Sequence, residues 1–202
     1  MQRLAWKQDL LARVAAAETA QPSTLDEALA RPDPAFARVA LTCRGLDRAP
    51  YVELYAIEDG EAGSRLISLC SSDTPILIDR GFVAATVSAR PPVDATASMP
   101  VVLRGILREG HAPGPFTPAG DERMLYARNI PALAARLGER GVNPHLMVVA
   151  ETSSNPEWQA LRPVALPTGL TNNHLGYALT WFGLAAALLG VYVALLRRTL
   201  RA

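Results

Sequence analysis

Residues 175–196 read LGYALTWFGLAAALLGVYVALL and contain no charged side chain. A helix needs about 20 apolar residues to cross the hydrocarbon core of a bilayer, and this run is long enough. In lipid every backbone N–H and C=O must be hydrogen-bonded within the segment, so the run is predicted to be a transmembrane helix. A buried core helix is the alternative interpretation, but such helices rarely continue this far without a charge.

The residues that flank this run predict its orientation. Tyr177 and Trp181 lie near its start, and aromatic side chains are enriched at membrane–water interfaces. Arg197, Arg198 and Arg201 follow its end, and basic residues remain on the cytoplasmic side of a membrane. We therefore expect a cytoplasmic C-terminus and a domain of roughly 170 residues, a usual domain size, on the opposite side.

An exported domain needs a signal, and the N-terminal sequence MQRLAWKQDLLARV is amphipathic and charged rather than continuously apolar. The sequence alone leaves two interpretations open. Either the protein is tail-anchored with its domain in the cytoplasm, or a membrane segment precedes the sequence given. The formal net charge of +1 does not fit the clustered basic residues of a nucleic-acid-binding domain, so no nucleic-acid partner is expected.

The pattern of apolar residues predicts an α+β domain made mostly of antiparallel strands. An N-terminal helix is expected over residues 2–20, and Thr24 opens a short second helix with capping-box spacing. Asn129 and Pro131 begin a helix that ends at Gly141. The glycine within the fourth predicted strand indicates a bulge or a close backbone approach. The predicted strands are residues 38–44, 51–57, 65–70, 76–85, 100–108 and 146–150.

The sequence carries little evidence of catalysis. It has no Gly-x-Ser-x-Gly elbow, P-loop, His-Glu-x-x-His or dinucleotide fingerprint, so we expect that it is not an enzyme. Cys43 and Cys70 are far apart and have no neighbouring histidine, so a metal site is not expected. Two separate buried thiols are the favoured interpretation, and a disulfide is the alternative in an oxidising compartment. Arg80 is interpreted as one half of a surface ion pair, and contact with an acidic group of a partner or ligand is the alternative.

Among the three histidines, His111 and His145 are interpreted as solvated surface residues, whereas His174 lies where the chain enters the bilayer. An interfacial role facing lipid headgroups is the simpler interpretation of His174. The functional hypothesis is a haem site, because a neutral imidazole is a common axial ligand of haem iron. Ala178 and Ala185 share its helix face and leave room for a flat apolar group, although small residues also serve helix–helix packing.

Residues 170–182, LTNNHLGYALTWF, closely resemble the C-terminal signature of the Surfeit-locus family of cytochrome oxidase assembly factors. Weaker similarities to other segments of the family occur in the same order as in the family and span nearly the whole chain. They are QRLAWK at residues 2–7, IDRGFV at 78–83, VLRGIL at 102–107 and FTP at 116–118.

The resemblance implies an extracytoplasmic domain enclosed by two membrane helices, on the periplasmic side of a bacterial inner membrane. On that basis residues 1–22 are expected to continue a first membrane helix that is missing from the sequence given. Residues 23–170 would form the domain, residues 171–198 the transmembrane helix and residues 199–202 a cytoplasmic tail.

The resemblance also implies a function. It predicts an assembly factor for cytochrome c oxidase that assists insertion of haem a into the catalytic subunit, with haem a synthase as a further candidate partner. His174 is then the candidate iron ligand, Tyr177 the candidate hydrogen-bond donor to a propionate, and Trp181 the candidate stacking partner of the porphyrin. The alternative is a membrane-anchored scaffold for oxidase subunits that binds no cofactor.

Overall fold

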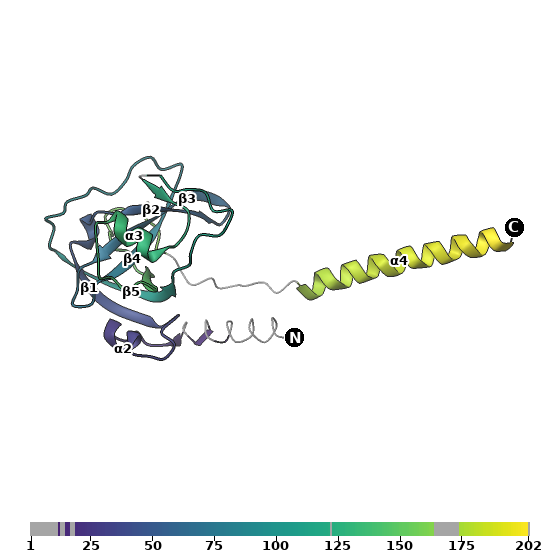
Figure 1. Cartoon of the computed structure of the whole chain (residues 1–202), viewed down its shortest axis with the longest axis horizontal. Helices are drawn as coiled ribbons and strands as arrows, with labels where there is room; N and C mark the ends of the chain where they lie inside the picture. Colours follow the sequence, from purple (N-terminus) through teal and green to yellow (C-terminus); the bar gives the residue numbers. More distant parts are fainter. Residues whose placement is uncertain (1–11, 13–14, 17–18, 122, 164–173, 202) are drawn as a thin grey trace. The chain divides into compact units, whose positions relative to one another are not determined.

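The computed structural model describes residues 12, 15–16, 19–121, 123–163 and 174–201 (Figure 1). The chain divides into two compact units, Met1–Leu166 and Pro167–Ala202, which we describe separately. The predicted helix over residues 2–20 and the expected continuation of a first membrane helix lie almost wholly outside the described residues.

The first unit is built on one sheet of seven strands in the order β1-β5-β7-β4-β3-β2-β6. Four of its strand pairings are antiparallel, and β2–β6 and β4–β7 are parallel. This mixed but mainly antiparallel sheet with few helices confirms the predicted α+β class. The strands are β1 (Arg38–Arg44), β2 (Val52–Glu58), β3 (Glu61–Cys70), β4 (Ile76–Ala84), β5 (Pro100–Glu109), β6 (Met124–Leu125) and β7 (Leu146–Ala150).

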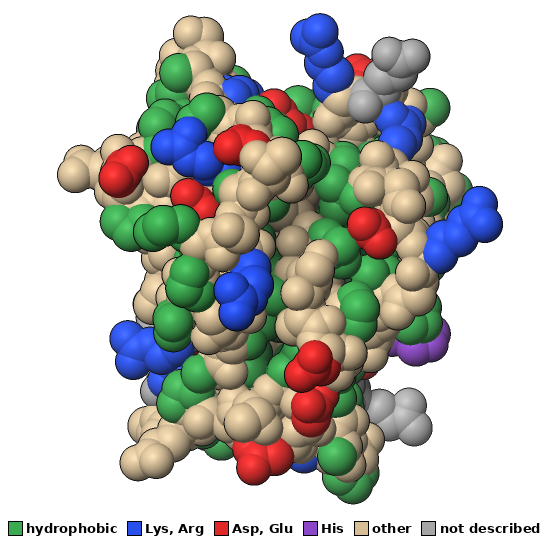
Figure 2. All heavy atoms as spheres, turned by 90° about the vertical axis from the view of Figure 1, so that its left-hand side faces the viewer, with side chains coloured by type: hydrophobic (Ala, Val, Ile, Leu, Met, Phe, Trp, Pro, Cys, Tyr) green, Lys and Arg blue, Asp and Glu red, His purple; other side chains and the backbone are tan. Residues whose placement is uncertain are grey.

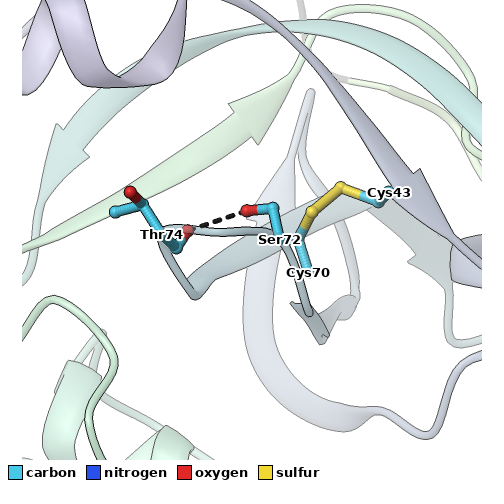
Figure 3. The surroundings of a disulfide bond; sticks show 4 residues. All are labelled: Cys43, Cys70, Ser72 and Thr74. Carbon is cyan, nitrogen blue, oxygen red and sulfur yellow. Dashed lines mark hydrogen bonds between the residues drawn. A yellow bond between two sulfur atoms is a disulfide. The ribbon is translucent and has the colours of Figure 1, made fainter.

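A disulfide shows that this sheet is strongly rolled. Cys43 on β1 and Cys70 on β3 are bonded, with 5.2 Å between their Cα atoms (Figure 3). The two strands are four positions apart in the sheet, which would separate them by about 19 Å if the sheet were flat. The sheet must therefore curl until β1 approaches β3. The favoured interpretation of two separate thiols is wrong, because strands distant in the sheet order meet across the roll.

The rolled sheet has an apolar cluster on each face. On the inner face, Ile78 and Leu107 pack in the cluster that includes the two cysteines. On the outer face, Leu77 packs with Ile130 and Leu133 of α3 (Ile130–Arg136). Because successive strand residues point to opposite faces, the apolar run of β4 supplies both clusters. This explains why every residue of β4 is buried.

Local sequence signals set the ends of several elements. The Thr24 hydroxyl accepts the Glu27 N–H and the Glu27 carboxylate accepts the Thr24 N–H, which closes the predicted capping box of α2 (Leu25–Leu29). Asp59 and Gly60 both have positive φ angles, of 51° and 82°, and join β2 to β3 as the tight turn that an Asp-Gly pair favours.

The second unit contains α4 (His174–Arg201). Residues Gly176–Leu200 are long and apolar enough to cross a membrane, and none of the most apolar window is buried against protein. The helix α4 therefore has the length and composition of the predicted transmembrane helix. On the first unit, the face drawn in Figure 2 carries basic and acidic side chains interspersed with apolar ones, without a large patch of either charge.

Candidate functional site

The candidate haem-binding residues lie on the first two turns of α4. The helix begins at His174, and Tyr177 and Trp181 follow three and seven residues later. Residues at these spacings share one helix face. Tyr177 is 67% exposed and Trp181 is 71% exposed, so the two aromatic side chains project from the helix without protein packing.

Thr180, which lies between these aromatic residues, is satisfied within the helix itself. Its hydroxyl donates to the carbonyl oxygens of Gly176 and Tyr177, at 3.2 and 2.7 Å. A polar group at membrane depth needs such a partner, so Thr180 does not require water or a second helix. The remaining candidates for ligand binding at the start of α4 are His174, Tyr177 and Trp181.

Arg80 of β4 does not lie on the surface, and the interpretation as a surface ion pair is wrong. It is fully buried on the inner face of the roll. Its guanidinium donates to the carbonyl oxygen of Asp47 at 2.8 Å and to the Ser154 hydroxyl at 3.0 Å, with longer contacts to Ala49 and Ser68. Burial lowers the pKa of Arg80 to about 10. Arg80 therefore ties β4 to the Leu46–Arg48 turn and to the segment after β7.

The neighbouring Asp79 points to the opposite face, as strand alternation predicts. Its carboxylate accepts a hydrogen bond from Arg65 at 2.6 Å, and Arg65 also pairs with Glu58 at 2.6 Å. Asp79 additionally accepts the Gly81 N–H at 3.2 Å. The adjacent charges of β4 thus belong to two separate networks, one on each side of the sheet.

Gly81 allows the chain that leads to the membrane helix to dock on β4. Its φ of +135° is strained for other residues, and a Cβ there would lie 2.4 Å from the carbonyl oxygen of Arg162. Phe82 and Arg162 exchange two backbone hydrogen bonds, of 2.8 and 2.9 Å, and the Arg162 guanidinium lies 5.0 Å from the centre of the Phe82 ring. The close backbone approach predicted for this strand is confirmed.

The segment that follows β7 also packs on the sheet domain. Asn155 and Leu161 are buried, and Leu161 packs with Leu66 and Val83. Residues 155–162 therefore belong to the folded sheet domain.

The other two histidines lie in the sheet domain. His111 and His145 are exposed, as expected. Among the described residues, no group of three or more His, Cys, Asp or Glu side chains could hold a metal ion. His174 stays the candidate iron ligand as a prediction from the sequence.

A rolled sheet domain followed by an apolar helix of membrane-spanning length defines a membrane-anchored protein. The SURF1 family matches residues 1–186, which include the sheet domain and the first half of α4, and the chain belongs to this family. It is also 28% identical over 142 residues to a SURF1-like protein of Drosophila melanogaster. That alignment covers 66% of this chain and 45% of the relative, so the chain spans a little under half of the relative's length.

Proposed function

We propose that this protein assists the assembly of cytochrome c oxidase from the membrane. The observation that carries the proposal is the family match over residues 1–186, which continues from the sheet domain into α4. The catalytic subunit of the oxidase would be the partner, and haem a synthase a further one. The lipid bilayer would surround α4.

The domain is proposed to lie on the periplasmic side of a bacterial inner membrane. The bond between Cys43 and Cys70 supports this location, because disulfides persist in oxidising compartments. Arg197 and Arg198 at the end of α4 support a cytoplasmic C-terminus. Both observations favour an exported domain over a tail-anchored one.

We further propose that α4 binds haem a through His174 and assists its insertion into the oxidase. The donor chemistry fits, because a neutral imidazole can serve as an axial ligand to haem iron. Ala178 and Ala185 on the same face leave room beside the helix backbone for a flat ring. Trp181 would stack against that ring, and the Tyr177 hydroxyl would hydrogen-bond a propionate. A haem with an apolar tail would keep that tail in lipid.

The assembly role is tested by deleting the gene and measuring haem a absorbance and oxidase activity in membranes. We expect both signals to fall and to return when the full chain is restored. Membranes that retain full oxidase content without the gene would contradict the proposal.

The haem role is tested by co-expressing the full chain with haem a synthesis and recording the absorption spectrum of the detergent-purified protein. We expect bound haem in the wild type, its loss in His174→Ala and its retention in His111→Ala, which removes an exposed histidine of the domain. A spectrum that persists in His174→Ala would refute the ligand assignment. A chain that restores the oxidase but never carries haem would act as the scaffold instead.

A further inference from the structure

Six arginines of the described chain are buried or half-buried, and four of them have oxygen partners. Taking a guanidinium from water is unfavourable unless its N–H groups find acceptors. Carboxylates supply these acceptors for Arg38, Arg65 and Arg90, and carbonyl and hydroxyl oxygens supply them for Arg80. The remaining two are Arg108 and Arg128.

Arg108 and Arg128 form no ion pair with a carboxylate among the described residues. The Nε atom of Arg128 is buried and has no hydrogen-bond partner there. The Arg108 guanidinium lies over the Phe36 ring, 4.8 Å from its centre, which covers one face of the group but accepts none of its in-plane N–H bonds. The Arg128 Nε–H is thus a buried donor without an acceptor, and neither guanidinium has a carboxylate partner among the described residues.

The backbone brings the two arginines together at one corner of the sheet. The segment that follows Arg108 runs beside Arg128, because the His111 N–H donates to the Arg128 carbonyl at 2.9 Å. A Cβ on Gly110 would also lie 2.9 Å from that carbonyl oxygen. Gly110 directly follows the end of β5 and is two residues after Arg108.

The charges at this corner do not balance. Burial lowers the pKa of Arg108, and the positive charges of Arg128 and Arg65 lower it further. Burial also lowers the pKa of Arg128, while Asp79 opposes this effect and Arg65 adds to it. Asp79 is already engaged by Arg65, whose second partner is Glu58. Three arginines, Arg65, Arg108 and Arg128, therefore share two carboxylates, which leaves an excess of one positive charge at this corner.

We propose that Arg108 and Arg128 form a binding site for an oxyanion, a phosphate or a carboxylate group. The planar fork of a guanidinium binds such groups through two parallel N–H···O bonds, and the buried Nε of Arg128 would gain its missing acceptor. The phosphate of a lipid headgroup and free inorganic phosphate share this chemistry. The site does not depend on the proposed role in oxidase assembly.

The test is calorimetric titration of the full chain in a neutral detergent with inorganic phosphate, against sodium chloride of equal ionic strength. We expect saturable phosphate binding that weakens about tenfold or more in Arg108→Gln and in Arg128→Gln, since each removes charge-assisted hydrogen bonds. Arg104→Gln is the matched control, because Arg104 is an exposed arginine of β5 and points to the same side as Arg108. Its phosphate affinity should stay at the wild-type value.

A second measurement uses only the wild-type chain, so it does not depend on the folding of any variant. Phosphate should slow modification of Arg108 by phenylglyoxal, read by peptide mass spectrometry, and leave the modification of Arg104 unchanged. If a lipid headgroup is the source, nanodiscs of phosphatidylglycerol should give the same protection without added phosphate, and nanodiscs of digalactosyldiacylglycerol, a lipid without phosphate, should not. Absence of saturable binding and of protection by either source overturns the proposal, as does phosphate affinity unchanged in both glutamine variants.

Discussion

The sheet domain and the membrane helix differ in what surrounds their side chains. In the domain, Arg80 is fully buried and donates to oxygens supplied by three other segments. Along Gly176–Leu200 of α4, none of the most apolar window is buried against protein. The domain therefore supplies partners for its own buried side chains, whereas the apolar side chains of α4 need lipid or another membrane protein around them. Substitutions in the domain should lower its free energy of unfolding, whereas substitutions in α4 should leave it almost unchanged.

The largest effect is expected from Gly81→Val. The substitution places a side chain against the Arg162 carbonyl and forces a residue other than glycine to a φ of +135°. We expect a loss of about 3 kcal/mol or more in the free energy of unfolding. Hydrogen exchange of the paired Phe82 and Arg162 amides should rise together, because the docked segment is released.

Gly60→Ala provides the control for this variant. Gly60 also has a positive φ, of 82°, but its Cβ would meet nothing within 4 Å. Gly60→Ala should lower the free energy of unfolding by only about 1–2 kcal/mol, which is the cost of the backbone conformation alone. Equal losses in the two variants would show that the approach of Arg162 is not what requires a glycine at residue 81.

An intermediate effect is expected when the disulfide is removed. Changing both Cys43 and Cys70 to Ser should lower the free energy of unfolding by about 2–4 kcal/mol, because the bond constrains a loop between residues 27 positions apart. Reduction of the wild type should produce the same loss in a denaturation curve, and the double variant should not respond to reductant. Two free thiols in protein purified from membranes without reductant would contradict both the bond and the proposed location.

The sequence predicts several local elements well and their long-range contacts poorly. The helix expected to end at Gly141 is an exception, because α3 ends at Arg136. The bounds of β1 and the capping box at Thr24 follow from patterns of a few neighbouring residues. The Asp59–Gly60 turn carries an equally local signal that was missed. The bond between Cys43 and Cys70 could not be predicted, because it depends on a sheet order that brings β1 round to β3.

The same limit applies to the charged residues. Alternation along β4 correctly separates Asp79 from Arg80, but it does not reveal that both faces of the strand are covered. The segment after β5 lies beside Arg128 because the His111 N–H donates to the Arg128 carbonyl. No spacing rule indicates that contact, so the oxyanion site was missed. His174 stays a sequence-based prediction, carried by its place at the start of α4.

The smallest effect is expected on α4. Leu188 is 74% exposed near the middle of the helix, whereas Leu107 is fully buried in the inner cluster of the domain. Leu188→Ala should change the unfolding of the domain by less than about 0.5 kcal/mol, while Leu107→Ala should cost about 2–5 kcal/mol. Thermal denaturation of the full chain in detergent, followed by near-ultraviolet circular dichroism, compares the two variants. A loss in Leu188→Ala as large as that in Leu107→Ala would mean that the domain relies on α4 for its stability, and the contrast between the two regions would fail.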